Sequence, residues 1–147
     1  MNFRNLSATL TLLAGLFLMT SCGKDDDKII DQVTRDITDG TWYISNFDDS
    51  GTDKTSNFTG YNFTFGETGV LTAQNGALIN IGTWEIVDGD ENDDVLDDLD
   101  FNISFPDLNG FGDLNDDWHI FAQSDDNLEL IESGGITDND LLSFKQN

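Results

Sequence analysis

Eight short segments of alternating apolar and polar residues constrain the fold of this 147-residue chain more than any other feature. An alternation with a period of two indicates a β-strand that has one buried face and one solvated face. In the clearest segment, apolar residues at positions 99, 101, 103 and 105 are separated by Asp100, Asn102 and Ser104. The predicted strands lie at residues 41–45, 60–65, 70–74, 78–87, 99–105, 118–123, 128–130 and 142–145.

The connections between these segments are short and rich in turn residues. Asn75-Gly76 gives the strongest hairpin signal, because both central positions of such a turn need a positive φ. No gap is wide enough for a crossover helix, so successive strands are expected to pair antiparallel as a meander. A meander with one apolar face leaves two bare edges unless the sheet closes on itself. The sequence therefore predicts an all-β fold, an eight-stranded antiparallel up-and-down barrel.

A short amphipathic helix precedes the strands. Ile29 or Ile30, Val33 and Ile37 recur at helical spacing with polar residues between them, and Gly40 ends the segment. A helix of two to three turns is not stable alone, so its apolar stripe must pack on the barrel. The predicted strands are shorter than the roughly nine to eleven residues of an outer-membrane barrel strand, and their apolar face is the inner one. We therefore exclude that class.

The first 28 residues predict where the protein resides. Arg4 precedes an apolar run from Leu6 to Met19, which is shorter than the roughly 20 residues that cross a membrane and fits a signal peptide. The run leads into Met19-Thr20-Ser21-Cys22, and Cys22 is the only cysteine. This order resembles the lipobox of bacterial lipoproteins, which implies cleavage before Cys22 and a lipid anchor of three acyl chains, palmitate among them. The alternative is an ordinary secretory signal with a chance cysteine.

An acidic triplet follows directly, enclosed by Lys24 and Lys28. It resembles the surface-export signal of lipoproteins in some Gram-negative groups, and the alternative is a solvated linker. We expect a signal peptide at residues 1–21, the acylated Cys22 with an acidic linker at 22–28, and a barrel domain at 29–147. The expected location is the outer membrane, with the lipid-anchored domain exposed at the cell surface.

The chain is strongly acidic, with 29 acidic against 6 basic side chains and a formal net charge of -23. A field of this sign repels phosphate backbones and anionic head groups, which argues against nucleic-acid binding and electrostatic membrane adhesion. The 11 Phe and 3 Trp argue against a disordered acidic chain. The length suits one core and not two, and we expect a monomer.

Several short motifs carry a resemblance to a known fold family. Gly40-Thr41-Trp42 opens the first strand, and Gly82-Thr83-Trp84 and Asp116-Asp117-Trp118 follow later. Together with the eight-stranded meander, these motifs resemble the lipocalin-like domains of secreted lipoproteins of Gram-negative bacteria, over residues 29 to 145. The resemblance implies a calycin-type barrel in which Trp42 packs at the closed end beneath a basic side chain. Lys145 is the only late basic residue for that contact.

The inward positions of the predicted strands form the candidate ligand-binding set. An eight-stranded barrel either is just filled by side chains or holds one small ligand. This interior is bulky and apolar, so it suits either a calyx for a small hydrophobic molecule or a packed core. The short strands favour the packed core, and no polar group marks specificity. The candidate ligand-binding residues are Trp42, Ile44, Tyr61, Phe63, Phe65, Trp84, Phe101, Ile103, Trp118 and Ile120.

Acidic residues concentrate at positions 88–100, where eight of 13 residues are Asp or Glu. Hard oxygen ligands at alternate positions suit calcium and are typical of the start of an EF-hand loop. The match is incomplete, because Asp93 stands where that loop needs Gly and Leu99 where it needs Glu. The alternative is a set of solubilising loops. The candidate calcium ligands are Asp88, Asp90, Asn92 and Asp94.

Catalytic chemistry has little support in the sequence. His119 is the only histidine, and nothing marks a nucleophile near it, so we expect no enzyme and no cofactor. The leading interpretation is a lipid-anchored binding protein of the outer membrane that holds a small hydrophobic ligand in its barrel. The alternative is a surface interaction or structural lipoprotein with a filled barrel, whose acidic loops contact a protein, a glycan or calcium.

Overall fold

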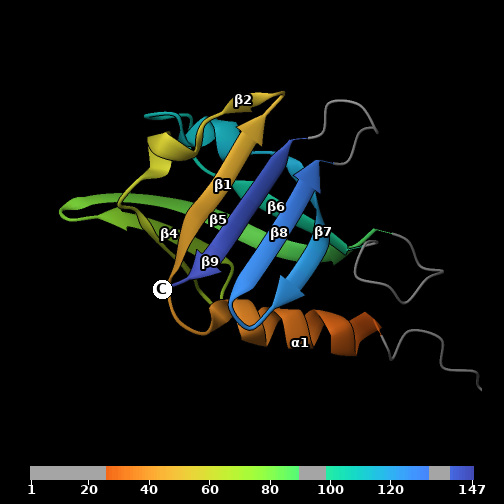
Figure 1. The fold of residues 1–147 in the computed structure, drawn as a ribbon. Helices are drawn as coiled ribbons and strands as arrows, with labels where there is room; N and C mark the ends of the chain where they lie inside the picture. The colour runs from red at the N-terminus through yellow and green to blue at the C-terminus, as the bar shows by residue number, and fades with distance from the viewer. Residues whose placement is uncertain (1–25, 90–98, 133–139) are drawn as a thin grey trace, which may run out of the picture.

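The computed structural model describes residues 26–89, 99–132 and 140–147, which form one α-helix and a closed antiparallel barrel (Figure 1). The helix α1 spans Asp26–Thr38, and two 3-10 turns lie at Thr55–Phe58 (η1) and Phe111–Leu114 (η3). The strands are β1 (Trp42–Asp49), β2 (Thr52–Asp53), β3 (Asn62–Phe65), β4 (Val70–Asn75), β5 (Leu78–Asp88), β6 (Leu99–Ser104), β7 (Asp117–Ser124), β8 (Asn127–Glu132) and β9 (Leu141–Gln146).

Eight strands make the barrel, and the predicted fold class is confirmed. From β3 to β9 each strand pairs antiparallel with the next, and β1 closes the ring by pairing with both β3 and β9. The two-residue β2 pairs only with the end of β1 and stays outside the ring. Figure 1 shows β1, β9 and β8 side by side in front, while β4, β5 and β6 cross behind them.

The inner faces of the strands form one continuous apolar core that is dominated by aromatic rings. Phe65 lies at its centre, and its ring meets those of Trp42, Trp84, Phe101 and Phe144 at centroid distances between 5.4 and 6.5 Å. All four contacts are edge-to-face, the arrangement that aromatic quadrupoles favour. Alternation along the strands therefore reports the inner face correctly through most of the barrel.

Two β-bulges interrupt that alternation. Between Ile44 and Asn46 the register of β1 against β9 shifts by one residue, so Phe47 turns inward and is fully buried opposite Leu142. A second shift lies between Ile120 and Ala122 in β7. The second shift was not predicted, because the residue that it turns inward, Gln123, is polar and leaves no apolar position out of phase.

The second bulge has a consequence for the helix. It leaves Phe121 62% exposed on the outer face and places Gln123 opposite the buried Leu128, on the inner side of the sheet. From there the Gln123 Nε2 atom donates a 3.0 Å hydrogen bond to the carboxylate of Asp36 in α1. Ala122 therefore lies opposite Glu129, and the residue beside it ties the helix to the barrel.

Both ends of the barrel are closed. At one end α1 buries Val33 and Ile37, and the indole N–H of Trp42 donates a 2.9 Å hydrogen bond to the Ile37 carbonyl. At the other end η1 and η3 bring in Phe58 and Phe111, whose rings meet at 5.5 Å. These two phenylalanines belong to turns, so the strand pattern did not predict them as core residues.

Three local predictions are corrected. The described helix already includes Asp26, three residues before the expected start at Ile29. The hairpin turn is centred on Gly76-Ala77, one residue later than predicted, and within it only Gly76 has a positive φ, 59°.

Within the described ranges, no helix is both long and apolar enough to span a membrane.

The third correction concerns the end of the chain. Lys145 is exposed and pairs with the outward Tyr43, so it does not lie over Trp42 as the lipocalin resemblance implied. Its neighbour Gln146 occupies that end of the barrel, where its amide donates a 2.7 Å hydrogen bond to the Asp39 carbonyl. An uncharged amide therefore secures the helix to β9 where a basic side chain was expected.

The close approach of β6 to β5 at Gly82 gives a test of the fold. A Cβ at this buried position would meet the Ser104 carbonyl oxygen and, at 2.7 Å, the ring of Phe105. We expect Gly82→Ala to lower the free energy of unfolding by about 1–3 kcal/mol, measured by urea denaturation. The exposed neighbour offers the control, because Thr83→Ala should cost less than about 1 kcal/mol. Equal stability of Gly82→Ala and the wild type would contradict this packing.

Candidate functional site

The barrel interior was the first candidate site, and it is filled. Nine of the ten predicted ligand-binding residues lie in the core with exposed fractions of 6% or less. The tenth, Tyr61, precedes β3 and is only half-buried, with its ring 5.2 Å from that of Phe111 at the closed end. The predicted inward position is observed for these nine residues, whereas Tyr61 lies at the barrel end, and ligand binding by any of them stays a prediction.

The polar atoms of this interior are already satisfied by the protein itself. The three indole N–H groups donate to backbone carbonyls: that of Trp42 to Ile37, that of Trp84 to Gly66 and that of Trp118 to Leu114, at 2.9 to 3.1 Å. Among the described residues, these three indole groups therefore have no free hydrogen-bond donor left for a ligand. These hydrogen bonds are typical of side chains in a packed protein core.

A cluster of three carboxylates at the rim opposite α1 is the second candidate. Asp116 precedes β7, Glu132 ends β8 and Asp140 precedes β9, and one carboxylate oxygen of each lies within 4.8 Å of the other two. The strand register produces this convergence, because Trp118 pairs with Glu132 and Ile131 pairs with Leu141. We call these three residues the rim cluster.

Asp140 is the fixed member of the rim cluster. It is 9% exposed, and its Oδ1 atom accepts a 2.6 Å hydrogen bond from the Ser50 N–H and a 3.2 Å bond from the Ser50 hydroxyl. The backbone of Ser50 has a φ of 51°, a left-handed conformation that residues other than Gly seldom adopt. The turn after β1 is thus shaped so that its N–H points at this carboxylate.

Asp116 is the electrostatically strained member. Burial raises the pKa of its carboxyl group above the ordinary value, and the negative charges of Asp140, Asp117 and Asp49 raise it further. The backbone N–H of Asp117 donates to the Asp116 carboxylate at 2.8 Å and offsets part of this effect. Among the residues that the structure describes, no basic side chain is paired with the rim cluster.

Another ion pair lies along the same rim. Lys54 bridges Asp49 and Asp113, with its Nζ atom 2.9 Å from the Asp113 carboxylate. The hydrogen bonds to Asp49 and Asp113 raise the pKa of Lys54. This clamp holds the β1–β2 turn to η3 and neutralises carboxylates beside the rim cluster, not within it.

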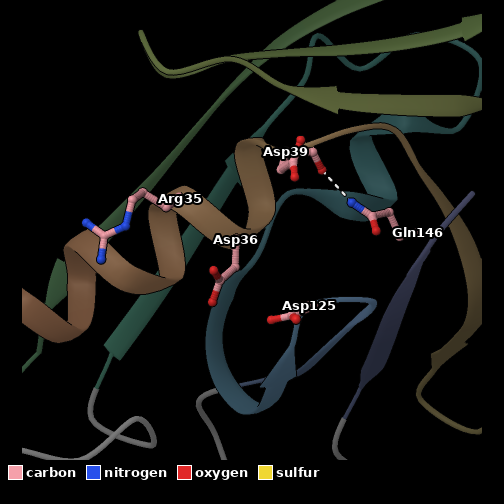
Figure 2. Close-up of a pocket in the computed structure, with 5 residues that line it drawn as sticks. All are labelled: Arg35, Asp36, Asp39, Asp125 and Gln146. Carbon is pink, nitrogen blue, oxygen red and sulfur yellow. Dashed lines mark hydrogen bonds between the residues drawn. The ribbon is translucent and has the colours of Figure 1, made fainter.

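A polar hollow of about 360 Å³ lies at the opposite end, between the last turn of α1, the β7–β8 turn and β9. Figure 2 shows Asp36 and Asp125 approaching it from the helix and the turn, while Arg35 points away from Gln146. The Asp36 carboxylate already accepts hydrogen bonds from Gln32, at 2.7 Å, and Gln123. We interpret this hollow as the seam that fastens the helix to the barrel.

Other predicted site residues fall as follows. Cys22, Asp90, Asn92 and Asp94 lie outside the described residues, and of the calcium candidates only the backbone of Asp88, at the end of β5, is described. His119 lies on the outer side of β7 with its Nδ1 atom 3.0 Å from the Asp100 carboxylate.

Comparison with known proteins bears on the fold. No family model and no curated protein matches the chain. The chain is similar to a solved structure, the crystal structure of a DUF4847 family protein from Bacteroides vulgatus ATCC 8482, with a TM-score of 0.52 and 18% identity. The match covers 78% of this chain and 97% of that one. At this identity the likeness concerns the fold, and it fits a calycin-like barrel.

The rim cluster gives a pH-dependent test. Because the folded state raises the pKa of Asp116, its ionisation near pH 7 costs stability, and Asp116→Asn should raise the urea midpoint there. The gain should shrink as the pH falls through the folded pKa and vanish below the ordinary value of 3.8, where the carboxyl group is protonated in both states. The Asn side chain keeps the acceptor for the Asp117 N–H.

The adjacent exposed carboxylate provides the control for net charge. Asp117→Asn removes the same charge from the same surface, and we expect a smaller change. A loss of stability in Asp116→Asn at pH 7, or a gain that does not vary with pH, would contradict the strain assigned to the rim cluster.

Proposed function

We propose that this protein is a lipid-anchored interaction protein of the outer membrane, with its calycin-like barrel exposed at the cell surface. The barrel acts as a rigid scaffold, and binding takes place on its outer surface. Cys22 carries the anchor, and residues 1–21 are the signal that is removed. This proposal is the second of the two sequence interpretations, in which the barrel is filled and acidic loops make the contacts.

The filled interior is the observation that favours this function over ligand transport. Phe63, Phe65 and Phe101 are at most 1% exposed in the middle of the barrel, where a carrier protein keeps its cavity. The helix at one end and the aromatic residues of η1 and η3 at the other leave no entrance among the described residues. A small hydrophobic molecule would have to displace packed rings in order to bind.

We also propose that the protein has no catalytic activity. The Nδ1 atom of His119 lies 3.0 Å from the Asp100 carboxylate, and among the described residues no hydroxyl group is hydrogen-bonded to the imidazole. A nucleophile that is activated by a histidine needs such a bond. The net charge of -23 likewise supports a partner other than nucleic acid.

A second candidate function is calcium-dependent contact through the rim cluster. Three carboxylates from three strand ends converge within 4.8 Å, and Asp140 is held in place by Ser50. Calcium prefers hard oxygen ligands of this kind, and a bound cation would offset the repulsion that raises the pKa of Asp116. The cluster would then be a cation-bridged patch on the rim of the barrel.

Native mass spectrometry of the protein extracted from its own host tests the anchored scaffold. We expect the mature chain to begin at Cys22 and to carry three covalent acyl chains, with no further apolar molecule bound. Cys22→Ser removes the anchor and should show the bare barrel, still without a ligand. A bound hydrophobic molecule at one copy per Cys22→Ser barrel would overturn the filled scaffold, and an unmodified wild-type chain would overturn the anchor. Antibody labelling of intact cells tests exposure at the surface.

Thermal denaturation in calcium or in chelator tests the second candidate. A cation that binds only the native state raises the melting temperature by mass action, so about 1 mM calcium should raise it in the wild type. Asp116→Asn and Asp140→Asn should each abolish this increase, whereas Asp117→Asn should keep it. The candidate fails if the wild-type melting temperature is the same in calcium and in chelator.

A further inference from the structure

The first half of β5 is an open strand edge on the outside of the barrel. β6 pairs with residues 83–88 only, so on that side residues 78–82 have no neighbouring strand among the described residues. The reason is local, because β6 ends at Ser104 and the buried Phe105 then packs against Gly82. A strand edge of this kind is a template for pairing with another chain.

The ladder shows which backbone groups are open. The N–H of Trp84 points toward the β4 side, where it donates to the Gly69 carbonyl at 2.9 Å. Along an antiparallel strand successive residues alternate in direction, so residues 78, 80 and 82 bond to β4. Ile79 and Ile81 therefore direct both of their backbone groups toward the open edge, and within the described chain neither has a partner there.

This edge lacks the features with which proteins protect an open strand. Lys, Pro or an inward charge would block pairing, but residues 68–84 contain no charged residue and no Pro. The side chains of Ile79 and Ile81 are 56% and 61% exposed. In a chain with 29 acids, this stretch carries none of the charges that repel a second acidic molecule.

We propose that two copies of this chain pair antiparallel through residues 78–82 of β5, about a two-fold axis at Asn80. The register is self-complementary, because Ile79 of one copy then faces Ile81 of the other and four isoleucines form one apolar row. A two-fold contact requires such self-complementarity of the same surface. This replaces the expectation of a monomer, and it does not depend on the lipid anchor.

The predicted dimer is weak. Five paired residues per copy bury far less than the roughly 1,600 Å² of a standard interface, so we expect a weak association that depends strongly on concentration. The opposing edges carry no carboxylates, and Glu67 and Glu85 lie at the two ends of the uncharged stretch. Association is therefore expected through this edge and not through the acidic rim.

Analytical ultracentrifugation over a concentration series tests the dimer. The chain used starts at Cys22→Ser, and every core residue, from Val33 to Phe144, lies within it. Ile81→Lys places a cation opposite Ile79 twice in each dimer and should weaken association by about tenfold or more. Phe121→Lys is the matched control, because Phe121 is equally exposed, at 62%, but lies on β7, and it should leave association unchanged.

Disulfide formation tests the register separately. The two-fold axis places residue 80 opposite itself in a non-hydrogen-bonded pair, where Cα atoms lie about 4.5 Å apart and a disulfide fits. Asn80→Cys should therefore cross-link readily, whereas Ile79→Cys should not, since its opposite residue is Ile81. Mixing Ile79→Cys with Ile81→Cys should restore the cross-link.

Three results would overturn the proposal. They are a chain that stays monomeric up to millimolar concentration, a dimer that Ile81→Lys leaves intact, and equal cross-linking of Asn80→Cys and Ile79→Cys. A monomer that instead adds an extended peptide from another protein at this edge also overturns it.

Discussion

The pairing of β1 with β9 is the contact on which the rest of this structure depends. β1 meets β3 at one residue pair, Trp42 with Phe63, so β9 holds most of its length in the barrel. The same pairing seats Gln146 against Gly40, whose φ of 83° admits no Cβ without a close contact with the Gln146 amide. The helix, the Trp42 hydrogen bond and the closed end of the barrel all follow from this join.

Most of the fold could be predicted because a strand is recognised from a local pattern, the alternation of apolar and polar residues with a period of two. Each of the eight strands has one apolar face, and closing the meander into a barrel buries these faces together while it leaves no bare edge strand, and the structure confirms that closure. The errors lie where a longer-range effect decides. At Phe47 and Gln123 an extra residue in the strand reverses which face a side chain occupies, and that depends on the partner strand. The ring of Phe111 reaches the core from a turn, which carries no period.

The candidate sites were predictable to a lesser degree. A set of inward residues follows from alternation, but whether they leave a cavity depends on their volumes and on what closes the ends. The rim cluster has no motif in the sequence, since Asp116, Glu132 and Asp140 are 8 to 24 positions apart. Strand register alone brings them together, and register is fixed by turn lengths and bulges. Acids at the ends of neighbouring strands were the one signal that pointed to it.

The distribution of charge argues that the outer surface has two separate roles. If the acids served solubility alone, they would be useful on every face of the barrel. Instead residues 55–84, which hold η1, β3, β4 and the open half of β5, contain one charged residue, Glu67. The acids lie mostly in the helix and in the connections between the other strands, whereas residues 68–84 carry no charge. A barrel with a packed interior can bind a partner only on its outer surface. The division of that surface into acidic and neutral parts is therefore the feature that a functional explanation must address.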